Sequence, residues 1–88
     1  MSTPTTGQLT MYTTTWCGFC RRLKSQLARE GIHLVEVDIE QNTEAAEFVM
    51  SVNGGNMTVP TLVFSDGTAM TNPSAKTVKA HLESLGAA

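Results

Sequence analysis

The sequence is poor in the features that mark membrane proteins and nucleic-acid-binding proteins. No apolar run is long enough to cross a membrane, and the opening MSTPTTGQ lacks the basic segment of a secretory signal. Only 16% of the residues are charged and the formal net charge is -2, which argues against a general affinity for nucleic acids. We therefore expect a cytoplasmic protein that contacts neither membranes nor nucleic acids.

Cysteine is scarce as well. The 88 residues contain two cysteines, Cys17 and Cys20, within the stretch TTTWCGFCRRL. Reducing compartments disfavour structural disulfides, so this pair is expected to be either catalytic or metal-binding. The short chain allows one domain, residues 1–88, in which the polar residues 1–7 are expected to be flexible.

Hydrophobic periodicity and turn signals predict alternating strands and helices. They are expected, in chain order, at 8–13 (strand), 17–30 (helix), 33–39 (strand), 43–52 (helix), 58–64 (strand), 68–70 (strand) and from 72–74 onward (helix). In the second strand Val35, Val37 and Ile39 are expected to share one buried face, and Asp66-Gly67 predicts a hairpin between the last two strands. This order, β-α-β-α-β-β-α, indicates an α/β fold whose first crossover is right-handed.

The two cysteines stand at the start of the predicted first helix. Unpaired backbone N–H groups and the helix dipole polarise that start positively, which lowers the pKa of a cysteine thiol from about 8.5 to roughly 3.5–7.5. Arg21, Arg22 and Lys24 follow directly and add positive charge. Only a thiolate attacks a disulfide, so Cys17 is the predicted nucleophile and Cys20, one turn further on, the candidate resolving thiol.

Two metal-binding interpretations stay open from the residues alone. Cys17, Cys20 and His33 match three ligands of a zinc-finger spacing, although residues 37–39, where the fourth ligand would stand, read Val-Asp-Ile. An iron–sulfur cluster shared by two chains, with Cys17 and an external thiol as ligands, is neither shown nor excluded. A redox pair is the favoured interpretation, because the cysteines open a helix that follows a strand.

From about Gln8 to Leu85 the chain resembles the glutaredoxin branch of the thioredoxin superfamily, through WCGFC, the TVP at 58–60 and the order of helices and strands. Within that branch it is similar to the mycoredoxins, the actinobacterial group that works with mycothiol, through YTTTWCGFCRRLK, VDIEQN, AAEFVMSVNGGNMTVPT and TNPSA. The resemblance implies a four-stranded mixed sheet in strand order 2-1-3-4, flanked by three helices. It also implies a redox-active disulfide between the cysteines and a cis Pro60, beside which the backbone of Val59 can pair with an incoming chain.

The charges that are missing near the cysteines indicate which small thiol is the co-substrate. Glutathione-linked glutaredoxins usually carry a lysine shortly before the CxxC and an acidic pair near the last helix. This chain has threonine at 13–15 and reads MTNPSA at 70–75. Mycothiol has no free carboxylate or ammonium, so an uncharged site suits it, with hydrogen bonds from Thr15, Thr58 and the loop backbone.

The resemblance therefore implies a thiol–disulfide oxidoreductase that takes mycothiol from S-mycothiolated proteins onto Cys17. A second mycothiol releases it, and an NADPH-dependent mycothiol disulfide reductase recycles the mycothiol disulfide, so Cys20 is needed only for dithiol substrates. No tightly bound cofactor and no resident metal are implied, and a monomer is expected. Trp16 is expected to be half-buried beside the site, and Phe19 to be exposed between the cysteines, where each contacts partner or thiol.

Two other kinds of protein would use the same cysteines. A redoxin that takes electrons from thioredoxin reductase, such as one that reduces ribonucleotide reductase, usually carries a Trp-Ser-Gly-Phe stretch that TNPSAKTV does not match. An iron–sulfur or zinc-binding protein would hold metal with these thiols and would be coloured or metal-containing when purified. The missing charges, in turn, disfavour a glutathione-linked glutaredoxin.

Overall fold

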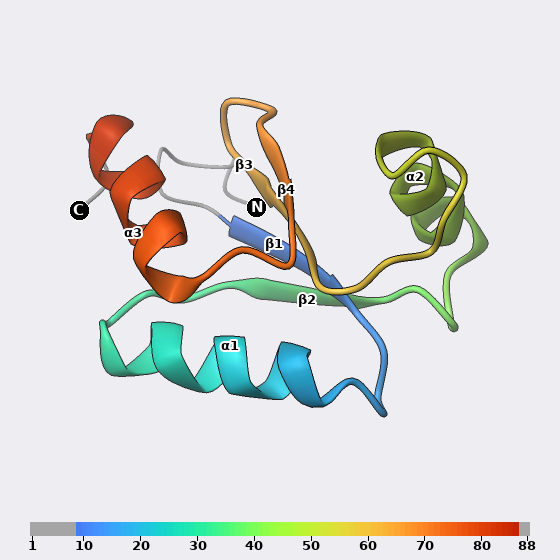
Figure 1. Ribbon diagram of the computed structural model, residues 1–88, viewed down its shortest axis with the longest axis horizontal. Helices are drawn as coiled ribbons and strands as arrows, with labels where there is room; N and C mark the ends of the chain where they lie inside the picture. Colours follow the sequence, from blue (N-terminus) through green and yellow to red (C-terminus); the bar gives the residue numbers. More distant parts are fainter. Residues whose placement is uncertain (1–8, 87–88) are drawn as a thin grey trace, which may run out of the picture.

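A computed structural model describes residues 9–86 of the chain (Figure 1). Its elements are β1 (Leu9–Thr13), α1 (Gly18–Arg29), β2 (Val35–Asp38), α2 (Thr43–Val52), β3 (Thr61–Phe64), β4 (Ala69–Thr71) and α3 (Ala75–Ser84). This order confirms the predicted β-α-β-α-β-β-α arrangement. The expected flexibility of residues 1–7 lies outside the described residues. Within residues 9–86, no helix has both the length and the hydrophobicity that a membrane crossing needs.

The four strands form one mixed sheet in the order β2-β1-β3-β4, as expected. β1 runs parallel to β2 and antiparallel to β3, and β3 pairs with β4 in an antiparallel hairpin. The parallel pair needs a crossover, which α1 supplies. As a result, the loop between β1 and α1, which carries the first cysteine, leaves the middle of the sheet rather than its edge.

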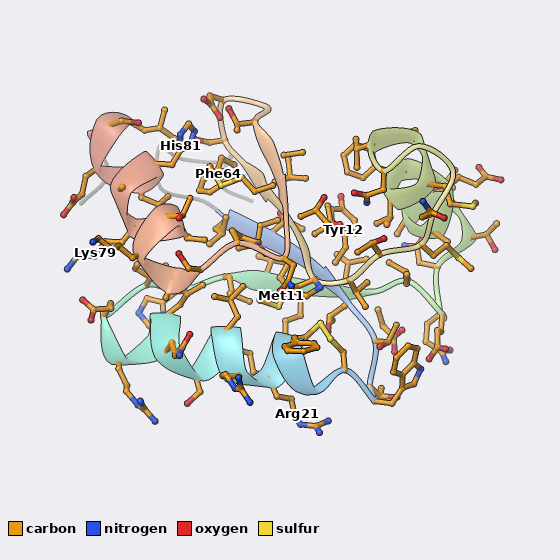
Figure 2. All side chains as sticks on the ribbon, in the orientation of Figure 1. Met11, Tyr12, Arg21, Phe64, Lys79 and His81 are labelled. Atoms are coloured by element: carbon orange, nitrogen blue, oxygen red, sulfur yellow. A yellow bond between two sulfur atoms is a disulfide. The ribbon has the colours of Figure 1, made fainter. Side chains whose placement is uncertain are left out.

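The sheet separates two hydrophobic clusters. Successive side chains of a strand point to opposite faces, and Figure 2 shows Met11 on the side of α1 and its neighbour Tyr12 on the side of α2. Met11 lies in the larger cluster with buried residues of α1, β3 and α3, and both cysteines belong to this cluster. Tyr12 packs against the smaller cluster, which includes Val49 of α2, and its ring lies 5.2 Å from that of Phe48.

The prediction for the second strand was wrong at its first residues. β2 begins at Val35, and the Val35 side chain is 48% exposed instead of buried. β2 is an edge strand, and the smaller cluster covers only its later part, where Val37 and Ile39 pack near α2. Leu34, just before the strand, packs on the larger cluster instead.

Local features of the sequence explain where α1 ends and where α2 begins. Asn42 caps α2, with its side-chain oxygen accepting the Ala45 N–H at 3.0 Å. After α1 the chain turns at Gly31 with φ of +75°, and the Gly31 and Ile32 N–H groups close the last turn of the helix. The first helix therefore covers the predicted range, with Cys17 as its N-cap.

The β3–β4 hairpin turns where Asp66-Gly67 predicted it. Gly67 has φ of +90°, which glycine adopts without steric cost. The Asp66 carboxylate accepts hydrogen bonds from the Thr68 N–H and hydroxyl, at 3.0 and 2.9 Å, and His81 Nε2 of α3 lies 3.2 Å from it. These contacts, those from Thr68 above all, lower the pKa of Asp66 below its usual value.

Candidate active site

Cys17 and Cys20 are joined by a disulfide at the start of α1, with their Cα atoms 5.2 Å apart. Cys17 is the N-cap residue, and its Sγ accepts a hydrogen bond from the Cys20 N–H at 3.0 Å. Both side chains are nearly covered, at 5% and 3% exposure. The Cys17 sulfur therefore occupies the place where a helix N-terminus stabilises negative charge.

The basic residues after the cysteines have different partners. Arg21 Nη1 donates to the carbonyl of Thr15 at 3.0 Å, which ties α1 to the loop before Cys17. Arg22 places its guanidinium 5.9 Å from the centroid of the Phe19 ring, a cation–π arrangement. Lys24 pairs instead with Glu36 of β2 at 2.9 Å. Its charge is therefore balanced by a carboxylate, and its expected contribution to the cysteines is not supported.

Two aromatic side chains beside the cysteines are exposed to solvent. Phe19 is 61% exposed. The expected half-burial of Trp16 is wrong, because its side chain is 68% exposed. The Trp16 Nε1–H donates to Glu40 Oε2 at 3.0 Å, which ties the indole to the loop after β2. The sequence carried no signal for this contact, since the two residues are 24 positions apart.

The segment before β3 contacts the larger cluster through Val59. This side chain packs against the cluster that contains Cys17 and Cys20, and Pro60 behind it is buried. The Val59–Pro60 peptide bond is cis. Thr58 is exposed, with its carbonyl accepting the Thr61 hydroxyl at 2.8 Å. Thr15 is also exposed. It precedes the cysteines in the chain, and its carbonyl accepts the hydrogen bond from Arg21.

The environments of two polar residues, Asn53 and Thr14, were not found by sequence reasoning. Asn53, after α2, bonds to β3 and β4 through its side-chain amide. Thr14, three positions before Cys17, is buried, and its hydroxyl has no hydrogen-bond partner within residues 9–86. A threonine near the end of a strand carries no pattern that distinguishes this environment from an ordinary core position.

In the part of the chain that the structure describes, the cysteines belong to no group of three or more metal-ligand side chains, and they lie away from a surface hollow at the other end of α1. Among residues 9–86, no three His, Cys, Asp or Glu side chains gather where an ion could bind, so the zinc interpretation finds no ligand set there. A hollow of about 510 Å³ lies where the end of α1 meets the start of α3, lined by Arg29, Lys76 and Lys79 among others. The cysteines stand at the opposite end of α1.

Comparison with known proteins agrees with this architecture. The family model described as Glutaredoxin matches residues 9–69, from the first residue of β1 to the first of β4. The chain belongs to the glutaredoxin family. A protein of Mycobacterium tuberculosis H37Rv named as a glutaredoxin is 62% identical over 77 residues, which are 88% of this chain and 92% of that protein.

One further sequence relative and one solved structure are also similar to this chain. Mycoredoxin 1 of Corynebacterium glutamicum is 48% identical to this glutaredoxin over 77 residues, 88% of this chain and 95% of that protein. The crystal structure of glutaredoxin grx-1 from Archaeoglobus fulgidus is similar with a TM-score of 0.67 at 26% identity, covering 82% of each chain. The resemblance inferred from WCGFC and TVP is thereby confirmed. This glutaredoxin is a thiol–disulfide oxidoreductase with the redox pair Cys17 and Cys20.

Proposed function

We propose that this glutaredoxin removes mycothiol from S-mycothiolated proteins, with mycothiol as its co-substrate. The absence of a lysine shortly before the CxxC and of an acidic pair near the last helix is the observation that carries the proposal. Residues 13–16 hold three threonines and a tryptophan, and residues 70–75 hold no acid that could pair with an ammonium. Arg21 and Arg22, the nearest cations in the chain, are engaged with the Thr15 carbonyl and the Phe19 ring. The 48% identity to a protein named Mycoredoxin 1 also supports it.

In the first step the Cys17 thiolate attacks the mycothiol sulfur of a mixed disulfide. The N-terminus of α1 favours this thiolate, because the Cys20 N–H that points at the Cys17 sulfur donates more strongly to a charged acceptor. A bond forms between the Cys17 and mycothiol sulfurs while the bond from mycothiol to the substrate protein breaks. The substrate sulfur leaves with the electron pair of that bond and takes a proton from solvent.

A second mycothiol completes the cycle. Its thiolate attacks the mycothiol sulfur held on Cys17, which gives mycothiol disulfide and regenerates the Cys17 thiolate. NADPH supplies two electrons to the mycothiol disulfide through a separate reductase. Cys20 takes no part in this route. With dithiol substrates, Cys20, which lies one helical turn after Cys17, closes the disulfide with Cys17.

Substrate binding is assigned to the exposed groups around the disulfide. The hydroxyls of Thr15 and Thr58 suit the hydroxyl-rich sugars of mycothiol, and the Trp16 and Phe19 rings offer apolar faces to them. Within residues 9–86, no hydrogen bond uses the N–H or the C=O of Val59. Both groups are therefore available to an incoming peptide that adds as a short strand.

The setting of the reaction follows from its chemistry. The pair must return to the thiol form between turnovers, which a reducing compartment allows, so we place the protein in the cytoplasm. The monomeric state expected from the sequence stays a prediction.

The proposal is tested by NADPH consumption with a small mixed disulfide under three recycling systems: mycothiol with its disulfide reductase, glutathione with its own, and thioredoxin reductase alone. We expect turnover with the mycothiol system. Turnover with thioredoxin reductase alone would instead assign the same cysteines to a thioredoxin-reductase-linked redoxin, and turnover with glutathione alone would refute the argument from the missing charges. Cys17→Ser, which removes the attacking sulfur, is the inactive control.

A further inference from the structure

A relay of side-chain hydrogen bonds joins the end of α2 to both strands of the β3–β4 hairpin. Asn53, the C-cap residue of α2, donates through Nδ2 to the Val49 carbonyl at 2.9 Å and to Thr61 Oγ1 at 3.1 Å. The Thr61 hydroxyl donates in turn to the Thr58 carbonyl at 2.8 Å. On its other side, the Asn53 Oδ1 accepts the hydroxyl of Thr71.

The donors and acceptors of this relay admit one arrangement. Both N–H groups of the Asn53 amide have acceptors, and a flipped amide would set its oxygen against the Val49 carbonyl, which is also an acceptor. The Thr61 hydroxyl has one hydrogen, and since it accepts from Asn53, it donates that hydrogen to the Thr58 carbonyl. Thr61 is completely buried, so water does not replace these partners.

The relay sets the direction of the Val59 N–H. In a planar trans peptide the C=O and the following N–H point in opposite directions. The Thr58 carbonyl is drawn toward the buried Thr61 hydroxyl, so the Val59 N–H in the same peptide plane points away from it. Within residues 9–86 this N–H makes no hydrogen bond.

We propose that Asn53 is a positioning residue for substrate recognition: through Thr61 it holds the Thr58–Val59 peptide plane so that the Val59 N–H faces an incoming peptide. This inference rests on the proposed function, in which the Val59 backbone pairs with the peptide carrying the mixed disulfide. Asn53 touches neither the substrate nor the cysteines in this scheme. Its loss therefore affects substrates that have a peptide backbone and spares those without one.

The test compares two mixed disulfides of mycothiol in the steady state, one with a cysteine-containing peptide and one with 2-mercaptoethanol. For Asn53→Ala and Asn53→Asp, we expect KM for the peptide substrate to rise about fivefold, the factor that one hydrogen bond typically contributes. KM for the small substrate and the rate of Cys17 alkylation by iodoacetamide should stay within about twofold of wild type, which is less than the effect of one hydrogen bond. Asn53→Asp keeps the size and the acceptor for Thr71 but lacks the N–H groups, so it separates donation from packing.

Asn56→Ala is the matched control. Asn56 lies in the same loop and is exposed, and within residues 9–86 its side-chain amide donates only to the Asn53 carbonyl, at 3.3 Å. This variant should keep the wild-type ratio between the two substrates. Wild-type values in Asn53→Ala and Asn53→Asp, or an equal loss on both substrates, would overturn the positioning role.

Failure of the proposed function gives a different result. Both substrates are also prepared with glutathione and assayed with its reductase, so the ratio is measured whichever thiol the wild-type protein accepts. Wild-type turnover with glutathione alone would contradict the assignment to mycothiol, and the ratio for Asn53→Ala would still test the relay.

Discussion

A carboxylate placed at Gly18 should disfavour the Cys17 thiolate without disturbing the fold. Gly18 is the first residue of α1, its φ is not positive, and a Cβ built on it meets no heavy atom within 4 Å beyond its chain neighbours. Gly18→Glu adds the charge, and Gly18→Gln, with the same shape and no charge, is the matched control.

The size of the effect follows from Coulomb's law. Side chains of adjacent residues place the carboxylate roughly 7 Å from the Cys17 sulfur, given Cα atoms about 3.8 Å apart. Two unit charges at that distance repel by about 1 kcal/mol when the effective dielectric constant is about 45, between the values for water and for a protein surface. The thiolate fraction at a pH where the thiol is mostly protonated should then fall about fivefold.

The assay is the rate of iodoacetamide alkylation against pH, in a Cys20→Ser background that leaves Cys17 as the single thiol. Gly18→Glu should react about fivefold more slowly than Gly18→Gln at low pH, and the difference should shrink in 1 M salt, where the screening length is about 3 Å. In the oxidised protein the same glutamate should raise the free energy of unfolding by about 0.3–1 kcal/mol, because it complements the helix dipole. Equal alkylation rates for Glu and Gln at all pH values would refute electrostatic control by the start of α1.

Three further predictions concern the scaffold. Leu27→Ala should lower the free energy of unfolding in urea by about 3 kcal/mol, because Leu27 is completely buried in the larger cluster; a loss below about 1 kcal/mol would contradict this packing. Asp66 has a lowered pKa in the folded protein, so Asp66→Asn should be less stable than wild type at neutral pH. The gap should close as the pH falls below about 4, and a gap that persists at pH 2 would exclude the carboxylate as its cause. Glu40→Ala should lower the fluorescence anisotropy of Trp16, the single tryptophan, and unchanged anisotropy would mean that the hydrogen bond does not hold the indole.

Signals that act within a few residues were readable from the sequence. Asp66-Gly67 marked the hairpin, and the same kind of local chemistry sets the helix ends, through side-chain capping by Asn42 and the positive φ of Gly31. Such features depend on local backbone chemistry, which the sequence carries directly. They were enough to predict the order of elements and to place Cys17 at the start of α1.

Exposure and long-range contacts were harder to predict. The alternation in 33–39 did not reveal that Val35 lies on an edge strand beyond the reach of α2, so its burial was overestimated. Trp16 is held outward by Glu40, and Lys24 is paired with Glu36, through contacts that form only when distant segments come together. The amide of Asn53 likewise meets β4 only in the fold, because Thr71 is 18 positions away.

The central claim is that Cys17 takes mycothiol from its substrate, and intact-mass analysis tests it most directly. Reduced Cys20→Ser protein is mixed with a mycothiolated peptide in the absence of free mycothiol, and the adduct is weighed and mapped. We predict one mycothiol on Cys17 together with stoichiometric release of the peptide thiol. An adduct of the peptide on Cys17 with release of mycothiol, or no adduct at all, would contradict the account.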